Sequence, residues 1–88
     1  MIDSITKDTF WAVVEDCLST FCFSGDSDRA RREAGKLRDF ISNAPDGIPT
    51  EMTYHNEPFD VACDIADIEL NISEYAADYI QILESHGW

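Results

Sequence analysis

The second half of this chain contains no lysine or arginine. Residues 39–88 hold eleven Asp and Glu residues and no base, which gives this part a formal charge of −11 out of −12 for the whole chain. A surface of this sign repels nucleic acid and anionic membranes, and it attracts basic protein surfaces. The alternative is that the acidity only maintains solubility. The six bases all lie within residues 1–38, at Lys7, Arg29, Arg31, Arg32, Lys36 and Arg38.

Cysteine pairs and targeting signals are also missing. Cys17, Cys22 and Cys63 are odd in number and form no CxxC pair, which argues against a disulfide framework and against a zinc site. We expect each to be a small buried hydrophobic residue in a reducing compartment. The first four residues lack the basic region of a signal peptide, and Glu15 and Asp16 interrupt the apolar run 10–23. These features predict a cytoplasmic protein that does not enter a membrane.

No recognisable catalytic motif is present. Only His55 and His86 are of the residue type that could act as an acid or base near neutral pH, and their spacing to other residues indicates no nucleophile–base pair. The sequence has no Gly-rich phosphate loop and no Glu-x-x-His motif. Residues 26–28 begin like a calcium loop, but position 37, where the final Glu would stand, is Leu37. We therefore expect no enzyme activity, no cofactor and no metal.

The apolar periodicity predicts an all-α fold, a compact four-helix array with short connections, in a single domain over residues 1–88. Residues 43–50 contain Pro45, Gly47 and Pro49 and are predicted to form a turn, whereas residues 51–56 fit either a helical turn or an extended link. The expected helices are Lys7–Cys22, Asp28–Ser42, Pro58 to Asp67 or Leu70, and Glu74–Ser85.

Helix ends and apolar stripes follow from the same pattern. Thr6, Asp26 or Ser27, and Ser73 are the expected N-caps, and Pro58 suits the first position of the third helix. The expected stripes are Phe10, Val14, Cys17, Leu18 and Phe21, with Trp11 on the flank; Ala30, Ala34, Leu37 and Ile41, widened by Phe40; Phe59, Ala62, Cys63 and Ala66; and Tyr75, Ala76, Tyr79, Ile80, Ile82 and Leu83.

The third helix carries a second apolar arc, formed by Val61, Ile65 and Ile68. Either this helix is central and buried on two sides, or these residues form an exposed patch. General burial preferences favour the core.

Acidic residues form a stripe on the third predicted helix. Glu57, Asp60, Asp64 and Asp67 follow one another at intervals of three, four and three, which places them on one face opposite the core stripe. Like charges at these spacings destabilise a helix by about 0.2–0.5 kcal/mol per pair, and a cationic partner would reverse that effect. The alternative is a solvated acidic face that the arginines of the second helix neutralise.

Three further residues extend the predicted partner-binding surface. Glu74 and Asp78 continue the acidic character on the fourth helix. Tyr54 precedes the third helix and is flanked by acids, which suits a binding hot spot. The alternative is that Tyr54 folds over the helix junction.

The sequence opens with Ile5-Thr6-Lys7-Asp8-Thr9-Phe10, and its Pro45-x-Gly47 turn is followed by an acid and Tyr54. Together with the chain length, these features resemble the small acidic immunity proteins of bacterial nuclease toxins, of the colicin and pyocin type. The resemblance covers residues 5–58 and implies a four-helix protein that binds and blocks a basic nuclease domain. In that family the second helix is acidic and a short third helix carries paired tyrosines. Here the second helix is basic and the pair is Tyr54-His55, which moves the expected acidic surface to the last two helices.

The leading hypothesis is an acidic protein-binding module, an inhibitor or immunity protein that masks a basic toxin domain by charge complementarity. Two alternatives stay open. One is a small structural or regulatory helical domain that acts through an apolar surface, and the other is a nucleic-acid mimic that occupies nucleic-acid-binding clefts.

Overall fold

The structure, a computed structural model, describes residues 4–42 and 57–87. In these ranges it contains four α-helices and no strand, which confirms the all-α four-helix prediction. None of these helices combines the length and the apolar character needed to cross a membrane. The elements are α1 (Ser4–Cys17), the π-helical segment η1 (Leu18–Cys22), α2 (Ser27–Ser42), α3 (Pro58–Ala66) and α4 (Ile72–Ser85).

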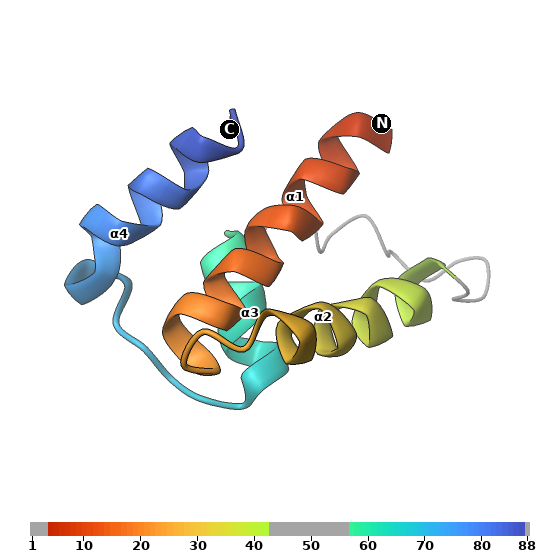
Figure 1. The fold of residues 1–88 in the computed structure, drawn as a ribbon, viewed down its shortest axis with the longest axis horizontal. Helices are drawn as coiled ribbons and strands as arrows, with labels where there is room; N and C mark the ends of the chain where they lie inside the picture. Colours follow the sequence, from red (N-terminus) through yellow and green to blue (C-terminus); the bar gives the residue numbers. More distant parts are fainter. Residues whose placement is uncertain (1–3, 43–56, 88) are drawn as a thin grey trace.

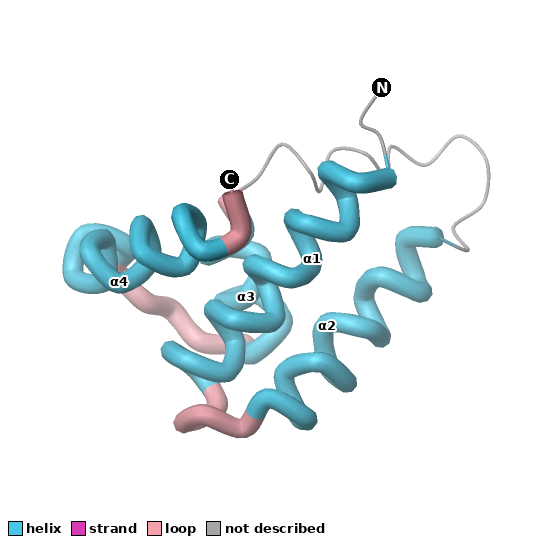
Figure 2. Tube along the Cα trace, turned by 45° about the horizontal axis from the view of Figure 1, so that its top comes forward, coloured by secondary structure: helices cyan, strands magenta, loops and turns pink. Residues whose placement is uncertain are grey.

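Helix α1 is the centre of the fold. It lies between α2 and α4, and α3 packs against it from a third direction (Figures 1 and 2). Val13 is completely buried although the predicted stripe did not include it, because the neighbouring helices cover α1 on several sides. The side chains of α1 that are 0–1% exposed are Phe10, Trp11, Val13, Val14 and Cys17.

The first predicted helix changes its geometry near its end. From Leu18 to Cys22 the turns widen to π-helix, and the Phe23 amide donates to the Leu18 carbonyl oxygen at 2.8 Å. This segment carries Phe21, whose ring centre lies 5.4 Å from that of Phe59 on α3 and 5.2 Å from that of Tyr75 on α4. Phe21 thus joins three helices, and the continuous helix predicted over residues 7–22 divides into an α and a π part.

Most helix ends follow local capping chemistry. The Asp26 carboxylate accepts from the Arg29 amide at 3.0 Å, which confirms Asp26 as the cap of α2. Asn71, and not Ser73, caps α4, because its side chain accepts from the Ser73 amide at 3.0 Å and the helix begins at Ile72. Thr6 lies inside α1, which begins at Ser4, so the prediction that Thr6 is an N-cap was wrong.

The apolar arc of α3 is divided between core and surface. Val61 is 4% exposed and belongs to the core, as predicted, and Ile65 is half-buried. Ile68 lies beyond the end of α3 and is 40% exposed. On α4, Ile80 was expected on the apolar stripe, yet it is 52% exposed because it lies at the edge of the face that meets the core. On α2, Phe40 was expected to widen the apolar stripe, yet it is 70% exposed, because the buried Ala30 and Ala34 lie on another side of the helix.

Two residues of the C-terminal part, Tyr79 and His86, attach α4 to the rest of the molecule through polar contacts. The Tyr79 hydroxyl donates to the Glu57 carboxylate at 2.8 Å and accepts from the Phe59 amide at 3.5 Å. The Phe59 amide belongs to the first turn of α3 and has no carbonyl partner within its own helix. At the other end of α4, the His86 ring contacts the Asp16 carboxylate of α1.

The Tyr79 contact generates a stability prediction. Tyr79→Phe should lower the free energy of unfolding by about 1–2 kcal/mol, because the Phe59 amide loses its partner in a buried position. Tyr75→Phe is the matched control, because the Tyr75 hydroxyl makes no hydrogen bond to any residue in the described ranges 4–42 and 57–87. Urea unfolding of the two variants measures the difference, and equal losses would show that the Tyr79 hydroxyl contributes nothing specific.

The three cysteines are free, and Cys17 and Cys63 are buried while Cys22 is half-buried. Burial, reinforced by the Asp16 carboxylate, raises the pKa of Cys17 from 9.0 to about 12. Burial likewise raises the pKa of Cys22 to about 11 and also raises that of Cys63. The thiols are therefore protonated at neutral pH and are poor nucleophiles.

These shifts predict a loss of stability at alkaline pH. Below pH 9.0 the Cys17 thiol is protonated in both the folded and the unfolded chain, and its contribution to stability is complete. As the pH rises from 9.0 towards 12, the unfolded chain releases this proton while the folded chain retains it, so the free energy of unfolding falls. Cys17→Ala should reduce that slope by up to about 1.4 kcal/mol per pH unit. Denaturant unfolding between pH 8 and 11 checks this, and an unchanged slope would contradict it.

Candidate functional site

The predicted acidic stripe lies on the exposed side of α3, but only two of its members are helical. Asp60 and Asp64 are one turn apart on α3, and both are exposed. Glu57 precedes the helix in extended backbone and is engaged by Tyr79. Asp67 follows the helix in the left-handed conformation, with a φ of 56°. The spacing had predicted that the four carboxylates share one helical face. The structure shows that they do not, because α3 contains only Asp60 and Asp64.

Asp67 ends α3 through a Schellman motif. The Ile68 amide donates to the Cys63 carbonyl oxygen at 3.1 Å, and the Asp67 amide donates to the Asp64 carbonyl oxygen at 3.2 Å. Glycine is the usual residue at this left-handed position because it has no Cβ, and Asp is one of the few others that tolerate it. The motif turns the chain into the extended linker 68–71, which runs beside α3 towards α4.

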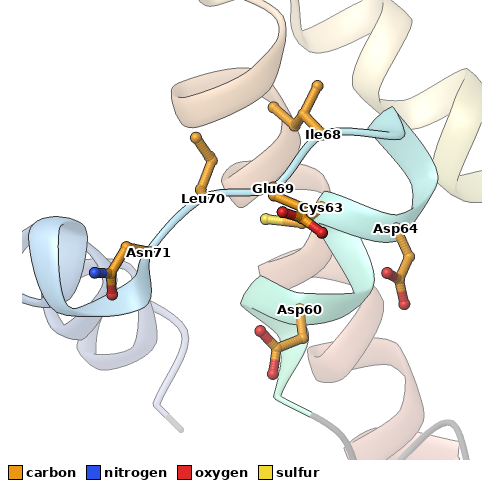
Figure 3. Close-up of a pocket in the computed structure, with 7 residues that line it drawn as sticks. All are labelled: Asp60, Cys63, Asp64, Ile68, Glu69, Leu70 and Asn71. Carbon is orange, nitrogen blue, oxygen red and sulfur yellow. The ribbon is translucent and has the colours of Figure 1, made fainter.

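The linker and α3 border a depression of about 560 Å³ that is open to solvent (Figure 3). The Glu69 side chain extends from the linker towards α3, whereas Ile68 and Leu70 project to the other side of the linker. A smaller hollow beside it adds Asp67 to the residues around this place. The residues that line the depression are Asp60, Cys63, Asp64, Ile68, Glu69, Leu70 and Asn71.

No base of the described part of the chain forms an ion pair with the four acids around the depression, Asp60, Asp64, Asp67 and Glu69. On α2, Arg38 contacts Asp8 of α1, and Lys36 pairs with Glu33 of its own helix at 3.2 Å. Among the residues that the structure describes, the bases of α2 therefore do not pair directly with these acids, and the alternative of a solvated acidic face stays open.

The chemistry of the depression suits binding. Carboxylates accept hydrogen bonds and attract ammonium and guanidinium groups. Cys63 offers no nucleophile, because burial raises the pKa of its thiol, and the nearby Asp60 and Asp64 carboxylates add to this effect while the Leu70 backbone opposes it. Across residues 4–42 and 57–87, no three His, Cys, Asp or Glu side chains come together in a way that would hold a metal ion.

The remaining predicted residues lie elsewhere. Glu74 and Asp78 are exposed on α4, and neither belongs to the lining of the depression. Tyr54 lies outside the described residues. The prediction missed Glu69, although its place between Ile68 and Leu70 matches the alternation of an extended segment, in which neighbouring side chains point to opposite sides.

The strained end of α3 generates a prediction. Asp67→Gly should raise the free energy of unfolding by about 0.5–1 kcal/mol, because glycine adopts a positive φ without steric cost and a negative charge leaves the negative end of the helix. Asp67→Asn is the control, since it removes the charge but keeps a side chain that tolerates this conformation. Thermal and urea unfolding measure both variants, and a loss of stability in Asp67→Gly would contradict the interpretation.

The chain was compared with known protein families, curated proteins and solved structures. No family model, no curated protein and no solved structure matches the chain. The proposed function therefore depends on the geometry and charge of the chain itself.

Proposed function

We propose that this protein is an acidic protein-binding module that masks a basic surface of a partner protein in the cytoplasm. Within this proposal it acts as an inhibitor of the immunity-protein kind, and its target is a basic nuclease toxin domain. The observation that supports it is the group of exposed acids around one depression, Asp60, Asp64, Asp67 and Glu69, with no ion pair to a base of the described chain. The free thiols are consistent with a reducing compartment.

Three acids around the depression occupy positions where they lower the stability of α3, and this supports a binding role. Asp64 and Asp67 lie at the negative end of α3, where an acid is unfavourable by about 0.3–1 kcal/mol. Asp60 and Asp64 repel each other one turn apart, and Asp67 occupies a position that favours glycine. A cationic partner removes the first two costs, because it neutralises the charges that cause them.

The mechanism is occlusion. The acidic surface accelerates the encounter with a basic partner, and the bound module covers the partner's anion-binding cleft. The resemblance of residues 5–58 to immunity proteins agrees with this mode, and here the acids lie on α3 and the linker in place of the second helix.

An apolar interaction domain remains the second candidate. Large apolar side chains are exposed away from the depression, with Phe40 on α2 at 70% and Ile80 on α4 at 52%. Such side chains suit contacts with another protein surface that do not depend on net charge.

Charge reversal tests the proposal. Asp64→Lys with Glu69→Lys should leave the fold intact, because neither residue lies in the first turn of α3 or at a positive φ. The same change should slow association with the basic partner about tenfold or more. The partner is isolated with the wild-type chain as bait, and association rates are measured at low and at near-physiological ionic strength.

The matched control is Asp28→Lys with Glu84→Lys, which changes the net charge equally on α2 and α4, at exposed residues outside the depression. Asp16 is not suitable as a control because it contacts His86. Salt should slow association of the wild type more than that of the Asp64 and Glu69 variant. Equal slowing by the two double variants would mean that net charge, and no particular surface, governs binding.

A further inference from the structure

The connection between α3 and α4 is bent without a helix-breaking residue. From Phe59 to His86 the sequence contains no glycine and no proline, so its composition is compatible with one continuous helix over this range. The chain nevertheless leaves the helix at Asp67, whose φ is 56°, and the next helix begins only at Ile72. The bend therefore depends on a left-handed residue other than glycine, followed by the extended linker (Figure 1).

The bent conformation is unfavourable within the connection itself. A residue with a Cβ is disfavoured at a positive φ, and Asp67 has one. In a straight helix Asp67 would take an ordinary helical φ, and the amides of the linker 68–71 would donate to carbonyl oxygens four residues earlier. A straight connection thus relieves the strain at Asp67 and lengthens the helical hydrogen-bond pattern of α3.

The docking of α4 is what opposes straightening, and it depends on few side chains. Helix α4 buries one side chain, Tyr79, which is fewer than α1, α2 or α3 buries. The rings of Tyr79 and Phe59 lie 5.5 Å apart, and those of Tyr75 and Phe21 lie 5.2 Å apart. A straightened chain exposes both sides of these contacts, so it is stable only where another α4 covers the face that its own α4 has left.

We propose that Asp67 is a hinge through which two copies of this chain exchange their α4 helices. In the exchanged dimer, residues 58–85 of each copy form one continuous helix, whose second part docks on α1 and α3 of the other copy. Every contact that α4 makes within one chain is then made between chains, with Tyr79 of each copy on Glu57 and Phe59 of the other. The occupant of the exposed face is a second copy, because that face already binds this helix in the single chain.

Strain in the hinge determines the balance between the two forms. Short connections under strain favour exchange, since the open form is relieved of a strain that the closed form retains, and a dimer is relieved of it twice. Association costs freedom of movement, and two copies of charge −12 repel each other, so high protein concentration and moderate salt favour the dimer. Exchange also removes the depression beside α3, because the linker that borders it becomes helical.

Two opposite substitutions at Asp67 test the hinge. Asp67→Ala and Asp67→Gly remove the same charge, but alanine disfavours a positive φ and favours a helix, whereas glycine does the reverse. The full chains are refolded from urea at high protein concentration and near-physiological ionic strength, and sedimentation equilibrium then gives the dimer dissociation constant. The constant of Asp67→Ala should be about a hundredfold or more below that of Asp67→Gly, with the wild type between them.

Equal association of the two variants, or an Asp67→Ala chain that stays monomeric at all concentrations, would overturn the proposal. Circular dichroism verifies that both variants are folded. Because no basic partner takes part in these measurements, their failure leaves the proposed function untouched.

Hydrogen exchange distinguishes exchanged helices from a dimer of closed chains. In the isolated dimer of Asp67→Ala, the amides of residues 69–71 should exchange at least about tenfold more slowly than in the monomer, because they are then inside a helix. The amides of α2 are the internal control and should be equally protected in both forms. A dimer in which residues 69–71 exchange as fast as in the monomer would retain the bend and would overturn the exchange.

Discussion

The arrangement of this molecule depends on the burial of α1. Phe10, Trp11, Val13, Val14 and Cys17 are all 0–1% exposed, so α1 needs apolar neighbours on several sides. Helices α2, α3 and α4 meet that need, and each of them packs on α1. In a chain of 88 residues, which buries a smaller share of its surface than larger domains, α1 supplies five of the thirteen buried apolar residues, and η1 and the other helices supply the rest.

Helix α4 depends on a smaller set of contacts. The ring of Tyr79 packs 5.5 Å from that of Phe59, its hydroxyl bridges Glu57 and the first turn of α3, and His86 meets Asp16. Along the chain, α3 is connected to α4 by the extended linker that follows the left-handed Asp67. This linker creates the depression, because it passes beside α3 with Glu69 extended towards the acids of that helix.

The separation of charge along the chain becomes a separation in space. Bases gather on α2, while acids without an ion pair to any described base surround the end of α3. A groove between these two helices has both signs in its lining, whereas all the charged residues that line the depression on the linker side are acids. The molecule thus offers two surfaces of different chemistry, and Asp64 takes part in both.

Much of the fold follows from local sequence alone. Apolar periodicity determined the number, order and approximate extent of the four helices, because it depends only on which residues share one face of a helix. Pro58 at the start of α3 and Asp26 as the cap of α2 were also predictable, since these effects operate within a few residues. The absence of bases after Arg38 similarly determined that any surface built from α3 and α4 is acidic.

Only the tertiary structure decided how these faces are used. The Tyr79–Glu57 and His86–Asp16 contacts join residues 22 and 70 positions apart, and no local pattern encodes such pairs. Val13 is buried because three helices surround α1, whereas periodicity identifies only the one most apolar face. Spacing placed Glu57 and Asp67 on a continuous helix, but α3 is shorter, and Glu69 joins the acids because the linker passes beside α3. The physical reason is the same in each case: the sequence specifies the faces of each helix relative to its own axis, and only packing against α1 determines which faces meet.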